Sequence, residues 1–135
     1  MENNTRLIEN DDYWTFIAHD PVVNTIIIDN AFGMELGEEE DSVSIRINGS
    51  FRVRKDGSEV LLHPKQTEEM GQVLSVLHAS ADLVRIYKIG NLELNFSNGL
   101  ILEVEPDSAG HTWEIANSGM FVFCTEDGDV SIWRK

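Results

Sequence analysis

Between residues 83 and 106, apolar residues occupy every second position of each run, and this alternation limits the possible fold more than any other feature. The apolar positions are Val84, Ile86, Leu92, Leu94, Phe96, Leu100, Leu102 and Val104. A period of two residues is typical of strands that bury one face. The segment is therefore predicted to form antiparallel strands.

Two glycine-containing turns set the pairing of these strands. A three-residue loop at Ser97-Asn98-Gly99 places Leu94 opposite Leu102, whereas a two-residue loop would place Leu94 opposite Glu103 and mix the two faces. The longer loop also puts its glycine at the left-handed position that a type I turn with a bulge requires. Lys88-Ile89-Gly90 repeats the arrangement. The prediction is a three-stranded meander; the alternative is one long strand through the earlier turn.

The remaining chain adds further strand patterns. Alternating or β-branched apolar residues predict strands at 22–29, 43–53, 112–116, 120–125 and 129–133, with a bend at Asn48-Gly49 inside the second. Asp56-Gly57 predicts a type I′ hairpin that pairs Val53 with Val60. The register of the last hairpin, around Asp127-Gly128, stays open because Phe-Val-Phe-Cys is apolar on both faces.

One helix is predicted at about residues 65–79. Met70, Val73, Leu74 and Leu77 have the i, i+3, i+4, i+7 spacing of a buried helical face. The fold class is therefore mainly β (α+β), with an antiparallel meander, sandwich-like sheets, about ten strands and this helix. Residues 1–12 are predicted to be a flexible N-terminus, and residues 13–135 a single β-rich domain.

The composition suits a cytoplasmic protein with its own core. The chain has 135 residues, of which 41% are hydrophobic, enough for one domain with a real core. Cys124 lies in an apolar run and is predicted to be a buried thiol. No apolar run approaches the roughly 18–20 residues of a membrane span, and the polar, acidic N-terminus is unlike a signal peptide. No membrane association is expected.

The charge is strongly negative and unevenly spread. The formal net charge is −14, and residues 1–41 hold eleven of the 24 carboxylates but only one base, Arg6. Direct binding to nucleic acid is disfavoured because phosphate contacts need clustered Lys and Arg. A basic protein partner is compatible with this charge, although acidity more often serves solubility.

No combination of residues with known catalytic or metal-binding chemistry stands out. The four histidines, His19, His63, His78 and His111, lack the spacing of metal ligands, and no glycine-rich phosphate loop occurs. Asp127-Gly128-Asp129 is better explained as a hairpin turn than as a calcium loop. Trp113 and Trp133 are expected to pack in the core or at a sheet edge. We therefore predict no enzymatic activity, no cofactor and no metal.

The turn glycines and alternating positions between Gly90 and Val104, followed by Trp113-Glu114-Ile115 and a terminal hairpin ending in Ile132-Trp133, resemble a bacterial family known only as a domain of unknown function. Upstream, the alternation from Ile45 to Phe51 and the Asp56-Gly57 turn are similar to its first half, so the resemblance covers roughly residues 22–134. It implies a shared fold. Proteins of this kind are similar to immunity proteins, and the resemblance supplies no catalytic residues.

The predicted function is a non-enzymatic protein-binding module. The leading hypothesis is an immunity protein that neutralises a cognate nuclease-type toxin by blocking its basic active cleft. One alternative is a small hydrolytic or ligand-binding β domain with a pocket in the sheet concavity. Another is a homo-oligomeric housekeeping domain that uses an exposed strand edge, so a homodimer is compatible with the sequence.

The candidate partner-binding residues are the densest charges in the chain. They are Glu35, Glu38, Glu39, Glu40 and Asp41, which lie in or beside a predicted hairpin loop. Such a loop could face Lys and Arg on a toxin and accelerate association. The alternative is a solvated loop that discourages edge-to-edge aggregation.

Overall fold

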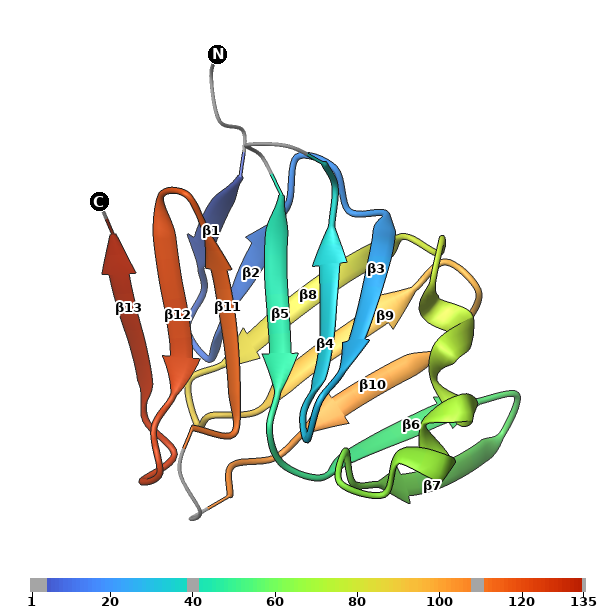
Figure 1. The fold of residues 1–135 in the computed structure, drawn as a ribbon. Helices are drawn as coiled ribbons and strands as arrows, with labels where there is room; N and C mark the ends of the chain where they lie inside the picture. Colours follow the sequence, from blue (N-terminus) through green and yellow to red (C-terminus); the bar gives the residue numbers. More distant parts are fainter. Residues whose placement is uncertain (1–4, 39–41, 108–110, 135) are drawn as a thin grey trace.

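The computed structural model describes residues 5–38, 42–107 and 111–134, which form thirteen strands in two antiparallel sheets (Figure 1). In spatial order, the seven-stranded sheet contains β1 (Arg6–Glu9), β2 (Tyr13–Ile17), β8 (Ala81–Tyr87), β9 (Leu92–Phe96), β10 (Ile101–Val104), β6 (Phe51–Lys55) and β7 (Ser58–Leu62). The six-stranded sheet contains β13 (Val130–Arg134), β12 (Met120–Cys124), β11 (Trp113–Asn117), β5 (Val43–Ile47), β4 (Phe32–Leu36) and β3 (Val23–Ile28). The prediction of a mainly β, antiparallel fold is confirmed.

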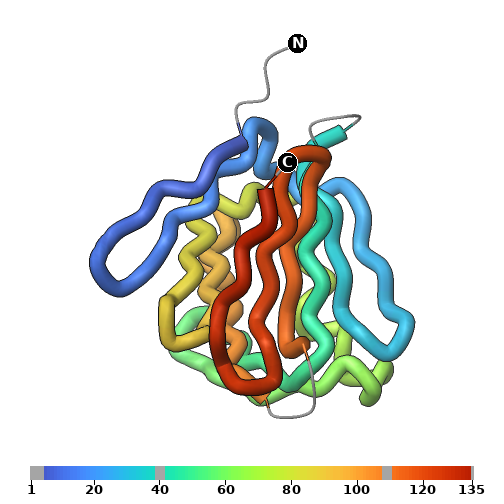
Figure 2. Tube along the Cα trace, turned by 90° about the vertical axis from the view of Figure 1, so that its left-hand side faces the viewer, coloured from blue at the N-terminus to red at the C-terminus, as the bar shows by residue number. Residues whose placement is uncertain are grey.

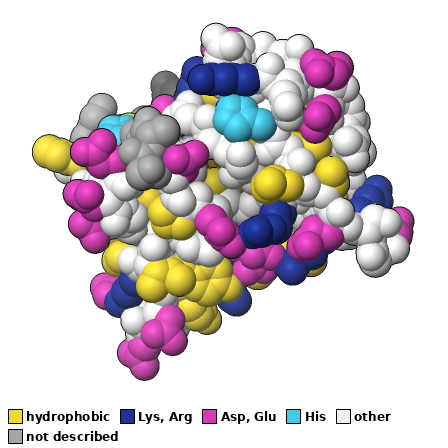
Figure 3. Space-filling model, turned by 90° about the horizontal axis from the view of Figure 1, so that it is seen from below, with side chains coloured by type: hydrophobic (Ala, Val, Ile, Leu, Met, Phe, Trp, Pro, Cys, Tyr) yellow, Lys and Arg dark blue, Asp and Glu magenta, His cyan; other side chains and the backbone are white. Residues whose placement is uncertain are grey.

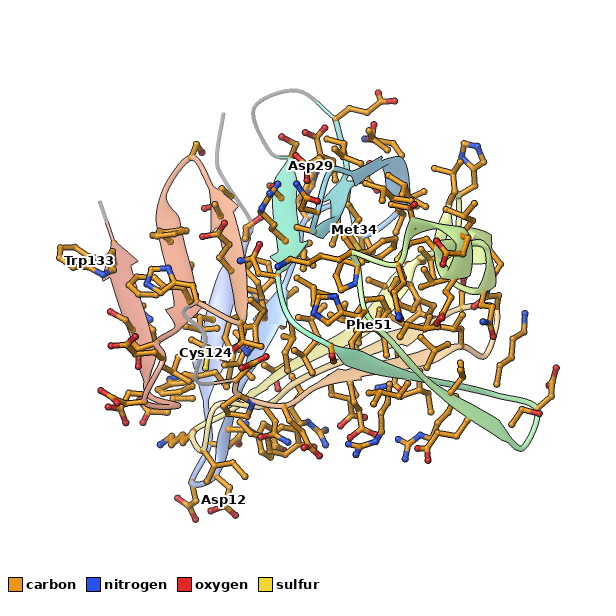
Figure 4. All side chains as sticks on the ribbon, turned by 60° about the horizontal axis from the view of Figure 1, so that its bottom comes forward. Asp12, Asp29, Met34, Phe51, Cys124 and Trp133 are labelled. Atoms are coloured by element: carbon orange, nitrogen blue, oxygen red, sulfur yellow. The ribbon has the colours of Figure 1, made fainter. Side chains whose placement is uncertain are left out.

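The two sheets pack face to face as separate layers, with the strands of one running obliquely to those of the other (Figures 1 and 2). Inward-facing side chains of both sheets form one buried cluster. Phe32 of β4 and Phe51 of β6 meet across it, with ring centroids 5.6 Å apart. Figure 4 shows Met34 and Phe51 on different sheets, both directed into the space between the layers.

The predicted meander is present as β8, β9 and β10. Leu94 pairs with Val84 on one side and with Leu102 on the other, and it is fully buried. In the second turn the Phe96 N–H donates to the Leu100 carbonyl at 2.9 Å, which closes the three-residue loop. Gly99 has φ +89° there, and Gly90 has φ +105° in the first turn. The glycines therefore provide the left-handed residues that these loops need.

The predicted Asp56-Gly57 hairpin is also confirmed. Both turn residues have positive φ, as a type I′ turn requires, and Val53 pairs with Val60. The bend at Asn48-Gly49 joins strands of different sheets: β5 ends before it and β6 begins after it. The alternation of the sequence continues through the bend because the odd-numbered apolar residues of both strands face the shared core.

The structure determines the register of the last hairpin, which the sequence left open. The Thr125 N–H donates to the Asp129 carbonyl at 2.8 Å, enclosing another three-residue loop with Gly128 at φ +86°. This register buries Val122 and Cys124 and turns the two phenylalanines of the run to the outer face. Cys124 is a buried thiol, as predicted, and its burial raises the pKa of that thiol.

The predicted helix over residues 65–79 is wrong. Its place is taken by two short 3₁₀-helices, η2 (Thr67–Gln72) and η3 (Leu74–Val76). Leu74 and Leu77 of the expected buried face are 44% and 39% exposed, whereas Met70, Val73 and Val76 are buried. A 3₁₀-helix has three residues per turn, so residues three apart share a face. This segment covers one side of the space between the two sheets (Figure 1).

The N-terminal prediction is wrong for Arg6–Glu9, which form β1. This strand pairs with β2 along its whole length, and Leu7, opposite Phe16, packs against the core. The pairing supplies backbone hydrogen bonds that a short polar segment lacks on its own. Residues 1–4 of the predicted flexible segment lie outside the described residues.

Two turns from different sheets meet at Gly90. A methyl group added to Gly90 would lie 2.5 Å from the Gly128 carbonyl oxygen and 2.7 Å from Cγ of Pro106. The Trp113 indole N–H, on β11, donates to the Gly90 carbonyl at 2.8 Å. Trp113 is fully buried, as predicted for a core tryptophan. This junction therefore fixes one end of the seven-stranded sheet against the six-stranded sheet.

Candidate functional site

The structure places Glu35 and Glu38 together at the end of the β4–β5 hairpin. Glu35 lies half-buried on the outer face of β4, and Glu38 is exposed two residues after that strand ends. Both carboxylates line an open hollow with Asn24 and Thr25 of β3 and with Ser42, which precedes β5. Glu39, Glu40 and Asp41, the other predicted site residues, lie outside the described residues.

The backbone beside Glu38 is held in place. The Gly37 N–H donates to the Val22 carbonyl at 2.9 Å, and the Asn24 side-chain amide donates to the Gly37 carbonyl. Gly37 has φ +75°, and an added Cβ would lie 2.9 Å from the Asp20 carbonyl oxygen. The position of the Glu38 backbone relative to β3 is therefore fixed by the fold.

Glu35 belongs to a row of side chains that crosses the outer face of the six-stranded sheet. The strand registers align, from β13 to β3, Trp133, Phe121, Ala116, Ser44, Glu35 and Thr25. Neighbouring strands lie about 4.8 Å apart, so three strand spacings put Glu35 about 14 Å from Phe121. The predicted carboxylate thus shares one face with aromatic side chains that the sequence analysis did not assign to a site.

The aromatic side chains on this face form a cluster that we call the aromatic surface, consisting of His111, Phe121, Phe123 and Trp133. The Phe121 and Phe123 rings are 5.0 Å apart, and His111 lies 4.4 Å from Phe123. Trp133 is 64% exposed and projects from β13 away from the core (Figure 4). Its indole N–H donates to the Ser131 hydroxyl at 3.0 Å. The prediction for Trp133 was therefore right about the sheet edge, but its side chain faces solvent.

A groove of about 350 Å³ adjoins the aromatic surface, and it is lined by Ala116, Asn117, Met120, Phe121, Trp133 and Arg134. Small residues separate the aromatic surface from Glu35, because Ala116 and Ser44 stand between them in the row. The face is thus a shelf with aromatic rings on one side and carboxylates on the other. A flat partner surface could contact both parts at once.

The outer face of the seven-stranded sheet has a different character. Arg85 lies over the Tyr13 ring, 4.3 Å from its centroid, and the Tyr87 hydroxyl donates to Glu93 at 2.8 Å. Asn95 donates to the other Glu93 oxygen at 2.8 Å. Burial raises the pKa of the Glu93 carboxyl, but these two hydrogen bonds and the Arg85 charge outweigh burial and lower it. These polar groups largely satisfy one another.

The arginines between residues 46 and 54 are paired rather than gathered into a basic surface. Arg46 contacts Asp29 at 3.1 Å and Arg52 contacts Glu105 at 2.6 Å. Arg54 forms an ion pair with Glu103 on the neighbouring strand. Seen from below, basic side chains are interspersed with acidic ones (Figure 3). The charge of each of these arginines is therefore offset locally, Arg46 on β5 of the six-stranded sheet and Arg52 and Arg54 on β6 of the seven-stranded sheet.

The described part of the chain contains neither a metal-binding cluster nor a helix that could cross a membrane. Within residues 5–38, 42–107 and 111–134, no group of three or more His, Cys, Asp and Glu side chains is arranged to hold a metal ion. In the same part of the chain, no helix combines the length and the apolar character that a membrane crossing requires.

Comparison with known proteins adds one finding. Neither the curated proteins nor the solved structures contain a match to this chain. A family model does match residues 17–134, from the end of β2 to the end of β13, and so covers nearly the whole fold described above. The chain therefore belongs to DUF6188, a family of unknown function.

Proposed function

We propose that this protein is a non-enzymatic protein-binding module, an immunity protein of bacterial type that neutralises a nuclease-type toxin by covering its basic active cleft. The contact surface is the outer face of the six-stranded sheet. The observation that supports this proposal is the exposed aromatic surface on the same face as Glu35, in a chain of net charge −14.

The aromatic surface has the composition of an interface centre. Binding energy in protein complexes is concentrated in a few large side chains, with tryptophan prominent among them. Trp133 is available for such a role because most of its side chain is in contact with solvent. Phe121 and Phe123 extend the apolar area beside it. A partner that covers this surface removes the aromatic rings from water and gains their hydrophobic free energy.

The carboxylates on the same face suit a basic partner. Glu35 and Glu38 stand at the far end of the shelf, where they would border the contact. Charges at the border of an interface accelerate the encounter of oppositely charged proteins more than they tighten the final complex. Nucleases bind a polyanion and therefore carry clustered Lys and Arg, which such an acidic face complements.

Two hydrogen bonds constrain parts of this face before a partner binds. The hydrogen bond to Ser131 orients the Trp133 indole, and the Asn24–Gly37 contact anchors the chain next to Glu38. Side chains that are already oriented lose less conformational entropy on binding. The Trp133 indole and the backbone next to Glu38 are therefore positioned before the partner arrives.

The proposal predicts that a neighbouring reading frame encodes a toxin-like domain, and the test of the aromatic surface uses that domain. Trp133→Ala should weaken binding to that domain by about 30-fold or more, the effect of losing about 2 kcal/mol at an interface centre. The variant should also lose protection of growth when both proteins are co-expressed. Calorimetry or surface-based kinetics gives the affinity.

Leu61→Ala is the matched control for Trp133→Ala. Leu61 is 60% exposed, but it lies on β7 of the other sheet. Its replacement should leave affinity and growth protection unchanged. Equal losses for the two variants, or a wild-type protein that neither binds nor neutralises the domain, would refute the proposed function.

The four consecutive carboxylates that follow Gly37 predict a separate effect, on the rate of association. Changing Glu38, Glu39, Glu40 and Asp41 together to Gln or Ser should slow association with the same domain by at least ~10-fold at low ionic strength. The dependence of the association rate on salt should become flatter, because the interaction between exposed charges is screened by ions. Binding kinetics at two salt concentrations measure both quantities.

Removal of carboxylates elsewhere controls for the change in net charge. Glu68 and Glu69 lie in η2, on a different part of the molecule. Their replacement by Gln removes two charges instead of four, and it should change the logarithm of the association rate by much less than half as much. An unchanged rate and salt dependence in the four-residue variant would make the loop a solubility feature, and the acidic part of the proposed face would have to be abandoned.

A further inference from the structure

The strand β13 leaves one backbone edge unpaired among the described residues. It is the terminal strand of the six-stranded sheet and pairs with β12 without a break in register. Asp129 accepts a hydrogen bond from Thr125 in the closing pair of the hairpin. Antiparallel pairing alternates, so Ser131 and Trp133 also direct their backbone groups to β12. The N–H and C=O groups of Val130, Ile132 and Arg134 therefore point to the free side.

The other three terminal strands carry features that discourage strand addition. β1 is short and charged at both ends, by Arg6 and Glu9. The pairing of β3 with β4 is irregular between Val23 and Thr25. β7 carries exposed Glu59 and soon meets Pro64. Charges, irregular pairing and proline protect sheet edges. β13 contains no proline, and its one charged residue, Arg134, is its last.

The side chains of β13 offer apolar contact on both sides of an added strand. Val130 and Ile132 face inward and are only partly buried against the core. Trp133 faces outward beside the groove of about 350 Å³. An added strand with alternating side chains would cover the first pair with one set and contact Trp133 with the other. The free edge and the aromatic surface are thus continuous.

The charges around this edge select a basic occupant. Glu126, Asp127 and Asp129 are exposed in the turn that leads into β13. The turn of β1 and β2 adjoins it through the β8–β9 turn, because the Lys88 N–H donates to the Asp12 carbonyl at 2.9 Å and Gly90 contacts Gly128. The exposed Asp11 and Asp12 of that turn therefore lie towards the same end of the edge as Glu126, Asp127 and Asp129. The nearby Lys88 is already paired with Glu9 at 2.7 Å.

We infer that β13 is the edge to which the partner adds an extended segment rich in Lys and Arg, pairing with Val130, Ile132 and Arg134 as a seventh strand of this sheet. The inference rests on the proposed function and specifies how the partner binds. A second copy of this chain is the less favourable occupant, because it would bring another net charge of −14 to the same edge.

The probe for this inference is a synthetic peptide that alternates lysine with isoleucine or valine. Its control has the same sequence and charge but carries N-methyl groups on the alternate amides of one edge, which removes the donors for strand pairing. The unmodified peptide should slow hydrogen exchange of the Val130, Ile132 and Arg134 amides. Exchange at Ser131 and Trp133 should change little, because those amides already bond to β12. The methylated peptide should bind at least ~10-fold more weakly.

An Ile132→Pro variant tests the same edge from the protein side. Proline removes an N–H that faces the free side, and an edge strand tolerates that loss. The variant should keep its circular dichroism spectrum and lose most of its affinity for the unmodified peptide. If the variant misfolds, the comparison of the two peptides on wild-type protein still decides the question.

Three results would overturn the inference. Equal binding of the two peptides would show that charge alone attracts them. Protection of the β1, β3 or β7 amides would place the addition at another edge. Protection of β13 in concentrated protein without peptide would identify a second copy as the occupant. Toxin neutralisation that depends on Trp133 together with any of these results would leave the proposed function standing and this inference refuted.

Discussion

Replacing Trp113 by alanine should lower the free energy of unfolding by about 3–5 kcal/mol, the range found when a buried aromatic residue is truncated. Trp113 is fully buried on β11, and its indole N–H donates to the Gly90 carbonyl of the other sheet. Alanine would leave a cavity between the layers and a carbonyl without its donor. Urea unfolding, followed by circular dichroism, measures the loss.

Two variants show where that loss comes from. Trp113→Phe keeps much of the buried ring but removes the donor, so it should cost about 1–3 kcal/mol, the range for leaving a buried polar group unsatisfied. Trp133→Ala removes the same side chain from an exposed position and should cost less than ~1 kcal/mol. If Trp113→Ala and Trp133→Ala lower stability equally, the assignment of Trp113 to the core is wrong.

Gly90→Ala is expected to be similarly severe, with a loss of about 2–6 kcal/mol in the free energy of unfolding. Two costs add: a non-glycine residue at φ +105° is strained by about 1–3 kcal/mol, and crowding in a packed region costs about as much. The added methyl group would lie 2.5 Å from the Gly128 carbonyl oxygen, where backbone has little freedom to move. The same urea titration measures this variant.

Gly99→Ala separates the two costs. Gly99 occupies the equivalent position of the next meander turn, with φ +89°, but an added methyl group would meet no atom within 4 Å. Its replacement should therefore show the conformational strain alone. The difference between the variants gives the cost of forcing the β8–β9 and β12–β13 turns apart. Equal losses at Gly90 and Gly99 would contradict the close packing of those turns.

Local pairing could be predicted from the sequence because the signal for a hairpin lies within the hairpin itself. Glycine positions at 57, 90 and 99 and the alternation around them determine which residues oppose each other, and the structure has those pairs. The pairing of β2 with β8, β5 with β11 and β6 with β10 had no such signal. These pairings join strands that are far apart in the sequence, and many strands with the same apolar alternation could serve equally well as the neighbour.

The 3₁₀ segment shows why periodicity alone was insufficient. The sequence from Met70 to Ala79 contains apolar residues that fit a period of 3.6 and others that fit a period of three. Leu74 and Leu77 support the first, and Val76 supports the second. The structure buries the second set because only a narrow strip of the segment faces the sheets. Tertiary contact, rather than local preference, decided which helix formed.

Only one part of the candidate site, the carboxylates, could be proposed from the sequence. Glu35 and Glu38 could be found from charge density, since four carboxylates in succession stand out in any sequence. The aromatic surface was missed because Phe-Val-Phe-Cys is apolar at every position, so the outward residues could not be told from the inward ones. An apolar residue on both faces of an edge hairpin was the available signal. Exposed apolar patches of this kind are typical of surfaces that bind other molecules.

The order of the strands also bears on how the chain reaches this structure. Five segments, β1–β2, β3–β5, β6–β7, β8–β10 and β11–β13, each contain strands that pair with their immediate neighbours in sequence. Short loops close these segments at little entropic cost, in microseconds for a typical hairpin. The three long-range pairings that unite them require distant parts of the chain to meet, and contacts of that kind slow folding towards milliseconds to seconds. Until they form, the apolar faces of all five segments are open to other chains as well as to each other.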